Sequence, residues 1–263
     1  MAGVNINGMI LDQQEWSYSK LTCFQDCPYK FFLKYFCRDS SCKKFYASYG
    51  SFMHDIIEKY YSGELKSPEE MELEFLTYFS DAVIGIPPSE QIMTEYIEKG
   101  RNYLATFKPF EYNVVDIEKW VNFEFAGARF AGRIDFIGED NGEYIIIDHK
   151  SRSLKPRSNR KKPTIKDKEL DEMLKQLYIY SAAIKQEYEK FPKKLCFNCF
   201  NNGNFIAEDF DMDTYLETEN WAKSIINKAK TASEFYPDIE FFKCRHICDM
   251  SEGCIYDQMM RGK

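Results

Sequence analysis

Apolar residues recur at helical spacing through the first third of the chain. We expect Ser19 to cap the first helix and Pro28 to interrupt it, because proline lacks a backbone donor and clashes with the preceding turn. Ser67 and Glu70 have the spacing of a capping box and mark the start of the third helix. The spacing predicts helices at residues 19–36, 50–61, from 68 onward, and 89–107.

Beyond residue 115 the apolar positions alternate with a period of two, which predicts strands. The dipeptide Asn141-Gly142 separates the last two of these runs and is a strong hairpin signal. The three strand-like runs cover residues 120–127, 129–140 and 143–151.

A helix over roughly residues 168–190 follows the third strand. A second hairpin over 195–210 turns at Asn202-Gly203, and Asp213 is expected to cap a last long helix. The order is therefore helices, three strands, a helix and two strands. It predicts an α/β fold in which helices flank a central sheet.

Composition changes this picture little, but the distribution of charge changes it more. The 263 residues include 44% hydrophobic and 29% charged residues, as in an ordinary globular protein. A net charge of −7 argues against nucleic acid as a partner. Residues 150–168, however, hold nine Lys and Arg against one acid, which favours a local phosphate-binding segment.

The amino-terminal sequence contains no pattern of a secretory or transit peptide. No apolar run is long enough to span a bilayer, so we expect no membrane partner. We therefore expect the protein to act in the cytoplasm, where it is made.

The run "YIIIDHKS" leads a buried strand directly into two charged residues, Asp148 and Lys150. Asp135 lies on the preceding strand, and an antiparallel hairpin would bring both aspartates to similar height. Two neighbouring carboxylates repel each other unless a cation lies between them, and oxygen ligands suit Mg²⁺ or Mn²⁺. Lys150 would then orient a water molecule or stabilise charge developing on a phosphate. The alternative is a solvated strand end with an ion pair.

Two further pairs have helical i, i+4 spacing. His54 and Glu58 share a face of one predicted helix, and Gln176 and Tyr180 share a face of the helix after Lys150. The ordered set is H-x-x-x-E, G-R-I-D, I-I-D-H-K and Q-x-x-x-Y.

This ordered set resembles the PD-(D/E)XK nuclease superfamily, in its RecB/AddB branch, over roughly residues 17–254. "WSYSKLTCFQDCPYKFFLKY" is similar to the amino-terminal segment of that branch, and "YGSFMHDIIE" to its histidine motif. The resemblance implies a restriction-endonuclease-like fold with a mixed central sheet. It also implies roles for individual residues: His54, Asp135 and Asp148 as metal ligands, Lys150 as the motif lysine, and Gln176 and Tyr180 at the rim that faces DNA.

Nine cysteines without a secretory signal do not indicate disulfides. Cys244, Cys248 and Cys254 lie close together in a polar tail. This pattern is typical of three of the four ligands of a metal site, so a fourth ligand must come from elsewhere in the chain. The resemblance supplies Cys27, in the "CP" position, and implies a [4Fe-4S] cluster. The chain departs from the family by having three residues, not two, between the first pair of tail cysteines. Zinc remains the alternative, because four thiolates also suit tetrahedral zinc.

Other cysteines compete for these roles. Cys23 is the rival of Cys27, and Cys37 and Cys42 have no predicted role. Cys196 and Cys199 form a C-x-x-C motif in a predicted strand, where they point to opposite faces, so we interpret them as core or surface thiols.

The sequence is best interpreted as a metal-dependent DNA nuclease. The resemblance implies an exonuclease acting on single-stranded ends in the 5′ to 3′ direction, alone or in a recombination or CRISPR adaptation complex. One alternative is a nuclease-fold DNA-binding subunit with little activity, and another is a zinc-stabilised interaction protein. We expect one nuclease domain over residues 1–263. It divides into a helical region (1–115) with the first cluster cysteine, a catalytic core (116–210), and a last helix with the cysteine cluster (211–263).

Overall fold

The computed structural model describes residues 6–39, 41, 42 and 44–256. A five-stranded sheet lies at its centre, in the order β1-β2-β3-β4-β5. Only the β3–β4 pair of this sheet is parallel, so the sheet is mixed, as expected. The strands are β1 (Asn113–Phe125), β2 (Ala128–Asp140), β3 (Glu143–Lys150), β4 (Lys194–Cys199) and β5 (Phe205–Asp209).

The predicted hairpin between β2 and β3 is confirmed. Asn141 and Gly142 both adopt positive φ angles, 53° and 81°, as a two-residue hairpin turn requires. The isoleucines of β3 are buried on both faces of the sheet: Ile146 packs in the main core, and Ile145 and Ile147 pack in a smaller cluster on the other side. A strand covered on both faces explains the unbroken apolar run.

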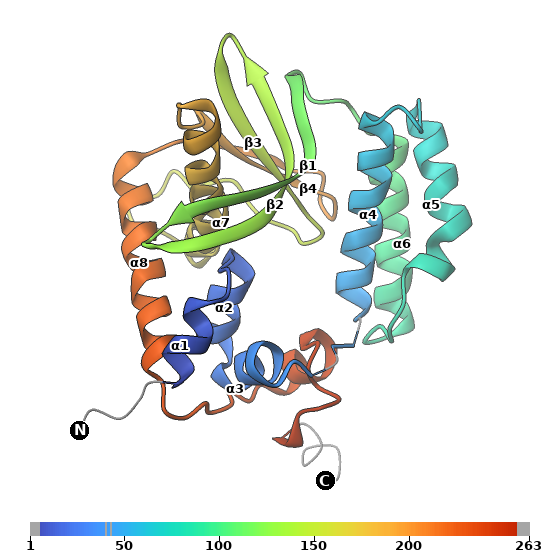
Figure 1. The fold of residues 1–263 in the computed structure, drawn as a ribbon. Helices are drawn as coiled ribbons and strands as arrows, with labels where there is room; N and C mark the ends of the chain where they lie inside the picture. Colours follow the sequence, from blue (N-terminus) through green and yellow to red (C-terminus); the bar gives the residue numbers. More distant parts are fainter. Residues whose placement is uncertain (1–5, 40, 43, 257–263) are drawn as a thin grey trace, which may run out of the picture.

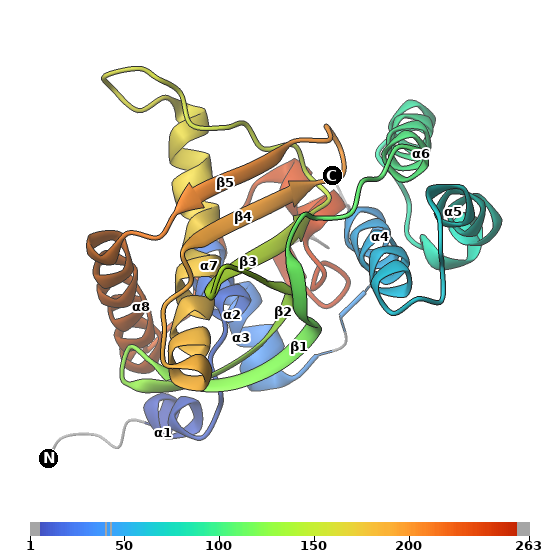
Figure 2. The same cartoon turned by 90° about the horizontal axis from the view of Figure 1, so that it is seen from above.

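Helices cover the sheet on opposite sides (Figures 1 and 2). α7 (Ile165–Tyr188) connects the parallel strands β3 and β4, as a crossover must, and packs with α8 (Met212–Thr231) on one side. α4 (Phe45–Tyr61), α5 (Pro68–Ala82) and α6 (Glu90–Ala105) lie on the other side. The expected flanked sheet is therefore confirmed.

The three helices α4, α5 and α6 form a core of their own. Tyr49 and Phe75 are fully buried in it. Gly100 allows the close approach of α6, because an added Cβ would lie 2.7 Å from the Phe75 ring and 2.8 Å from the Tyr49 hydroxyl. Ser67 and Ser89 cap α5 and α6 through their side chains.

The amino-terminal segment and the carboxyl-terminal tail lie next to each other below the sheet (Figure 1). The chain breaks at Pro28, as predicted, since a new helix begins there. α1 and α2 both contact α8. The elements here are α1 (Ile6–Asp12), α2 (Tyr18–Asp26), α3 (Pro28–Phe32), the π-helical turn η1 (Leu33–Cys37) and, in the tail, η2 (Lys243–Ile247).

Two predicted caps are wrong by two residues. Ser17, not Ser19, caps α2, because its Oγ accepts from the Lys20 amide. Asp211, not Asp213, caps α8 by accepting from the Thr214 amide. In both cases two similar polar residues stand at the helix start, and only the backbone conformation decides between them. Among the described helices, none is both long and apolar enough to cross a membrane.

Candidate metal and nucleic-acid site

The two aspartates predicted from the hairpin lie on neighbouring strands. Phe136 pairs with Ile147, so Asp135 on β2 and Asp148 on β3 occupy the next step of the same ladder. Both side chains are buried, and the backbone amide of His149 donates to Asp135 Oδ2 at 2.7 Å. Burial, and then the charge of Asp148, raise the pKa of Asp135 to about 7. A cation beside this pair would oppose that shift, because it favours the charged form of both carboxylates.

His54 on α4 points into the same cluster. Its Nε2 lies 3.1 Å from the carbonyl oxygen of His149. A carbonyl can only accept, so Nε2 carries the hydrogen and Nδ1 faces the carboxylates. Nδ1 is 3.5 Å from Glu118 Oε1 and 3.6 Å from Asp135 Oδ2. Burial acts to lower the pKa of His54, but Asp135 and Glu118 outweigh it and raise that pKa.

The adjacent histidine, His149, has a different environment. The side-chain amide of Asn198 lies 3.0 Å from His149 Nδ1, and the ring is buried. Burial, then the nearby His54 and Lys150, lower its pKa well below the usual value. His149 is therefore a neutral core residue, while its main chain supports the site.

Glu118 on β1 is a site residue that the sequence did not reveal. Its φ is 49°, in the left-handed region that non-glycine residues rarely adopt, and its side chain is only 6% exposed. One ligand atom each from His54, Glu118 and Asp135 lie within 4.8 Å of one another. Glu58, which shares a helix with His54, is instead exposed. The predicted strand began at residue 120, so no pattern placed Glu118 in it.

Lys150 makes two polar contacts at the end of β3. Its Nζ is 2.7 Å from Asp148 Oδ2 and donates to Gln176 Oε1, also at 2.7 Å. Tyr180, expected at the rim that faces DNA, is 9% exposed and packs against Gly132, where an added Cβ would lie 2.7 Å from its ring. Gln176 on α7 thus connects the helix to the charged end of β3.

A cleft of about 740 Å³ opens beside these residues. His54, Asp135, Gln176 and Tyr180 line it, together with the amino-terminal end of α2. Lys20 on that end is buried, which lowers the pKa of its ammonium to about 8. The cleft thus contains carboxylates, a histidine and cationic side chains, as a site for a metal and a phosphate would.

The basic segment only partly follows expectation. Arg157 pairs with Asp171 and Glu208, so its charge is neutralised within the protein. Arg160 and Lys161 are exposed. The exposed part of the segment keeps its predicted capacity to bind phosphates.

The four cysteines singled out in the sequence line one small cavity: Cys27, Cys244, Cys248 and Cys254. Cys23, the rival of Cys27, is buried in the main core, and Cys196 and Cys199 are buried in β4. Cys27 Sγ accepts from two backbone amides, those of Lys30 at 3.4 Å and Asp238 at 3.5 Å. Two such donors suit a thiolate.

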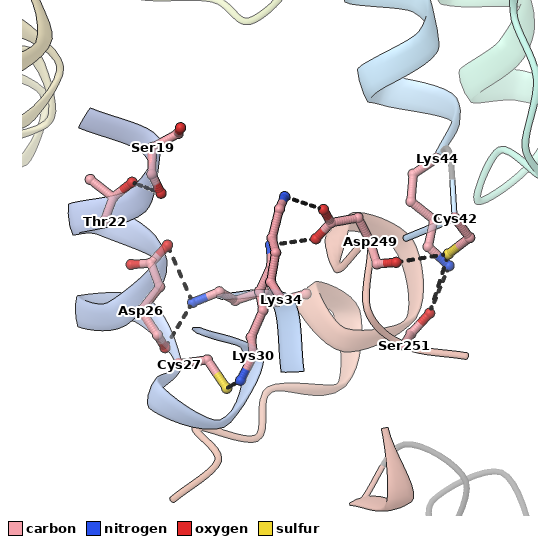
Figure 3. A network of polar contacts seen from close by, with 11 residues as sticks. Ser19, Thr22, Asp26, Cys27, Lys30, Lys34, Cys42, Lys44, Asp249 and Ser251 are labelled. Atoms are coloured by element: carbon pink, nitrogen blue, oxygen red, sulfur yellow. Dashed lines mark hydrogen bonds and ion pairs between the residues drawn. The ribbon is translucent and has the colours of Figure 1, made fainter. Parts of the chain in front are cut away.

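Polar contacts also bind the tail to the amino-terminal helices (Figure 3). Asp249 pairs with Lys30 at 2.8 Å and with Lys34 at 2.6 Å. The Cys42 amide donates to the Asp249 carbonyl, and Lys44 Nζ donates to Ser251 Oγ. These contacts hold the tail beside α3 without using any of the four cavity cysteines.

Comparisons with known proteins agree with this arrangement. The family model of the PD-(D/E)XK nuclease superfamily matches residues 15–255. A search of curated proteins found no match. A candidate exonuclease from Eubacterium rectale has a similar structure, with a TM-score of 0.55 and 12% identity over 96% of this chain and 92% of that chain. At that identity the likeness shows a shared fold alone. SSO0001 matches at 15% identity over 93% of this chain and 87% of that chain, with a TM-score of only 0.38.

Proposed function

The chain belongs to the PD-(D/E)XK nuclease superfamily, and we propose that it is a metal-dependent DNA exonuclease of the RecB/AddB type. The observation that carries this proposal is the meeting of His54, Asp135, Asp148 and Lys150 in one cluster, of which His54 and Asp135 line the cleft. We propose single-stranded ends as the substrate and 5′ to 3′ as the direction, on the resemblance of the motifs. The whole chain would act as one nuclease domain, in the cytoplasm, where unbridged cysteines persist.

The donor set fits a divalent cation. Asp135 has a raised pKa because it is buried next to Asp148, and His54 directs Nδ1 at two carboxylates. His54, Asp135 and Asp148, with Glu118, would hold Mg²⁺ or Mn²⁺ through oxygen and imidazole ligands. When bound, such a cation supplies positive charge for a phosphate and activates a water molecule for attack.

The remaining residues would orient the reactants. Lys150 lies between Asp148 and Gln176, so its ammonium is fixed in direction and can stabilise charge on the phosphate. Gln176 keeps Lys150 in place, and Tyr180, one turn further along α7, packs against Gly132 on β2. The exposed Arg160 and Lys161 would hold the phosphates of the strand outside the cleft.

We further propose that Cys27, Cys244, Cys248 and Cys254 hold a [4Fe-4S] cluster. All four cysteines line one cavity. Four thiolates suit either a [4Fe-4S] cluster or a single tetrahedral zinc ion. The resemblance of the motifs favours the cluster, and zinc remains the alternative.

Two other functions compete with this one. A nuclease-fold DNA-binding subunit would keep the fold but cleave little, and a zinc-stabilised interaction protein would need neither aspartate. The ordered contacts of Asp135, Asp148 and Lys150 favour an enzyme over both. A recombination or CRISPR adaptation complex is the kind of assembly in which we propose that it acts.

The test is digestion of end-labelled single- and double-stranded DNA with Mg²⁺ or Mn²⁺. We expect metal-dependent loss of the single strand from its 5′ end. Asp148→Asn and Lys150→Ala should each lower kcat at least about 100-fold. Glu58→Gln, an exposed change one helical turn from His54, is the control and should leave kcat unchanged. Wild-type turnover by Asp148→Asn would show that the site is elsewhere.

A further inference from the structure

An exposed tryptophan lies at the mouth of the cleft. Trp120 on β1 is 63% exposed, whereas Trp16 is buried and Trp221 is half-buried. Its side chain lines the same cleft as His54 and Asp135. An indole with this exposure contributes little to the core, and its position beside a candidate reaction centre suggests a contact with substrate.

The strand register fixes the distance of Trp120 from the acidic cluster, which consists of Glu118, Asp135 and Asp148. Trp120 stands directly opposite Arg133 on β2, and Arg133 is 56% exposed. Asp135 follows two residues further along β2, a rise of about 7 Å. An extended nucleic-acid strand covers a similar distance with one nucleotide. A phosphate at the acidic cluster would therefore place a neighbouring base near the indole.

The chemistry of this position selects unpaired bases. Every base offers an aromatic face, so stacking on an indole is tolerant of sequence. In a duplex those faces are covered by neighbouring base pairs, and an indole at the rim cannot reach them. Arg133 adds a cationic group beside the indole, although its Nε is engaged by Glu118 Oε2 at 2.6 Å.

We propose that Trp120 is a stacking platform for the unpaired base next to the phosphate being cleaved, and that it gives the cleft its preference for single strands. This inference rests on the proposed nuclease function, which supplies the position of the phosphate. It assigns Trp120 a specificity role that neither the acidic cluster nor Lys150 can supply. Trp120 binds substrate without taking part in proton transfer.

The first test is kinetic. Trp120→Ala should raise KM for a single-stranded oligonucleotide roughly 5- to 150-fold, the range expected for loss of one stacked base, with a smaller change in kcat. Trp120→Phe should restore most of the affinity. Tyr78→Ala, an exposed aromatic on α5 away from the cleft, is the matched control. Equal KM values for Trp120→Ala and Tyr78→Ala would overturn the proposal.

An abasic substrate separates stacking from a general structural effect. When the abasic site occupies the position that would face the indole, the wild type and Trp120→Ala should cleave the strand at the same rate. A loss that persists on the abasic strand would show that Trp120 acts through the fold, and not through a base.

A binding measurement distinguishes failure of this proposal from failure of the nuclease function. Oligothymidine added in EDTA should quench the tryptophan fluorescence of the wild type, and Trp120→Phe should remove most of that quenching. Because no turnover is needed, the result holds even if the protein cleaves nothing. Unchanged quenching in Trp120→Phe would contradict the platform.

Discussion

Glu118 reaches the acidic cluster through an unusual backbone conformation. A left-handed φ on a glutamate inside a strand costs on the order of 1–3 kcal/mol, and it persists only where the surroundings hold it. Here the Arg133 side chain holds its Oε2, and the His54 ring lies 3.5 Å from its Oε1. Such strain is typical of a site selected for function. The carboxylate is therefore a metal ligand in our proposal.

The substitution Glu118→Gln tests whether the Glu118 carboxylate is a metal ligand. Glutamine keeps the size of the side chain but removes the charge, so Mn²⁺ affinity should fall about 10- to 100-fold. Isothermal titration of the purified protein with Mn²⁺, without DNA, measures this directly. Thermal unfolding of the apo protein should stay close to that of the wild type. Glu58→Gln is again the matched control, and equal Mn²⁺ affinity in the two variants would exclude Glu118 as a ligand.

The sequence predicted the residues whose role depends on local pattern. Asp135, Asp148 and Lys150 stand at fixed positions in alternating strands next to a recognisable hairpin, so their proximity follows from period and turn. Glu118 depends on a local change of backbone conformation, the positive φ inside β1. The alternation of apolar and polar residues carries no record of such a change.

At the scale of elements, one carboxylate, Asp167, anchors the later part of the basic segment between β3 and α7. Asp167 accepts from the amide and hydroxyl of Ser158 and from the amide of Thr164, while the Thr164 side chain accepts from the Asp167 amide. This is a capping box extended to the loop. No local pattern predicts this anchored loop, because one side chain joins residues that lie nine positions apart.

Asp167→Asn should loosen that loop in a pH-dependent way. The hydrogen bonds from Ser158, then those from Thr164, hold the pKa of Asp167 well below its usual value. A depressed folded pKa adds stability that is complete above the unfolded pKa, near 4, and is lost as pH falls toward the folded pKa. The wild type should therefore unfold at a higher temperature than the variant at pH 5–7, and this difference should shrink in acid.

Asp213→Asn is the control for this experiment. Asp213 is an exposed carboxylate in the first turn of α8 and is not its cap. Its replacement should leave the unfolding temperature nearly unchanged at every pH. Hydrogen exchange should locate the effect of Asp167→Asn in residues 150–164. A constant difference between wild type and Asp167→Asn from pH 7 to pH 3 would contradict the assigned bonds.

At the scale of the whole molecule, the order of elements was predictable and their packing was not. A helix between two strands predicts the crossover that makes β3 and β4 parallel. The separate core of α4, α5 and α6 depends on close contacts such as Gly100 against Phe75. The pairing of Asp249 with Lys30 and Lys34 joins residues more than 200 positions apart. Neither leaves a local pattern in the chain.

The same long-range contacts make the cluster proposal testable. Cys27→Ser should fold, because the Asp249 ion pairs still hold the tail, but it should lose the cluster. Wild type purified anaerobically with iron supplied should be brown and contain iron and sulfide, whereas Cys27→Ser should be nearly colourless. Thermal unfolding of the variant should occur at a lower temperature, since ligand binding free energy contributes to folding.

Cys37→Ser is the matched control for Cys27→Ser, because Cys37 is exposed and lies outside the cysteine cavity. It should stay brown. A colourless wild-type protein that contains one equivalent of zinc would show that the cavity binds zinc and not an iron–sulfur cluster. That outcome would leave the nuclease proposal intact, because Asp135, Asp148 and Lys150 contact His54, His149 and Gln176, which lie on other elements than the four cavity cysteines. Loss of the colour should therefore change stability first, and cleavage only as far as the fold is weakened.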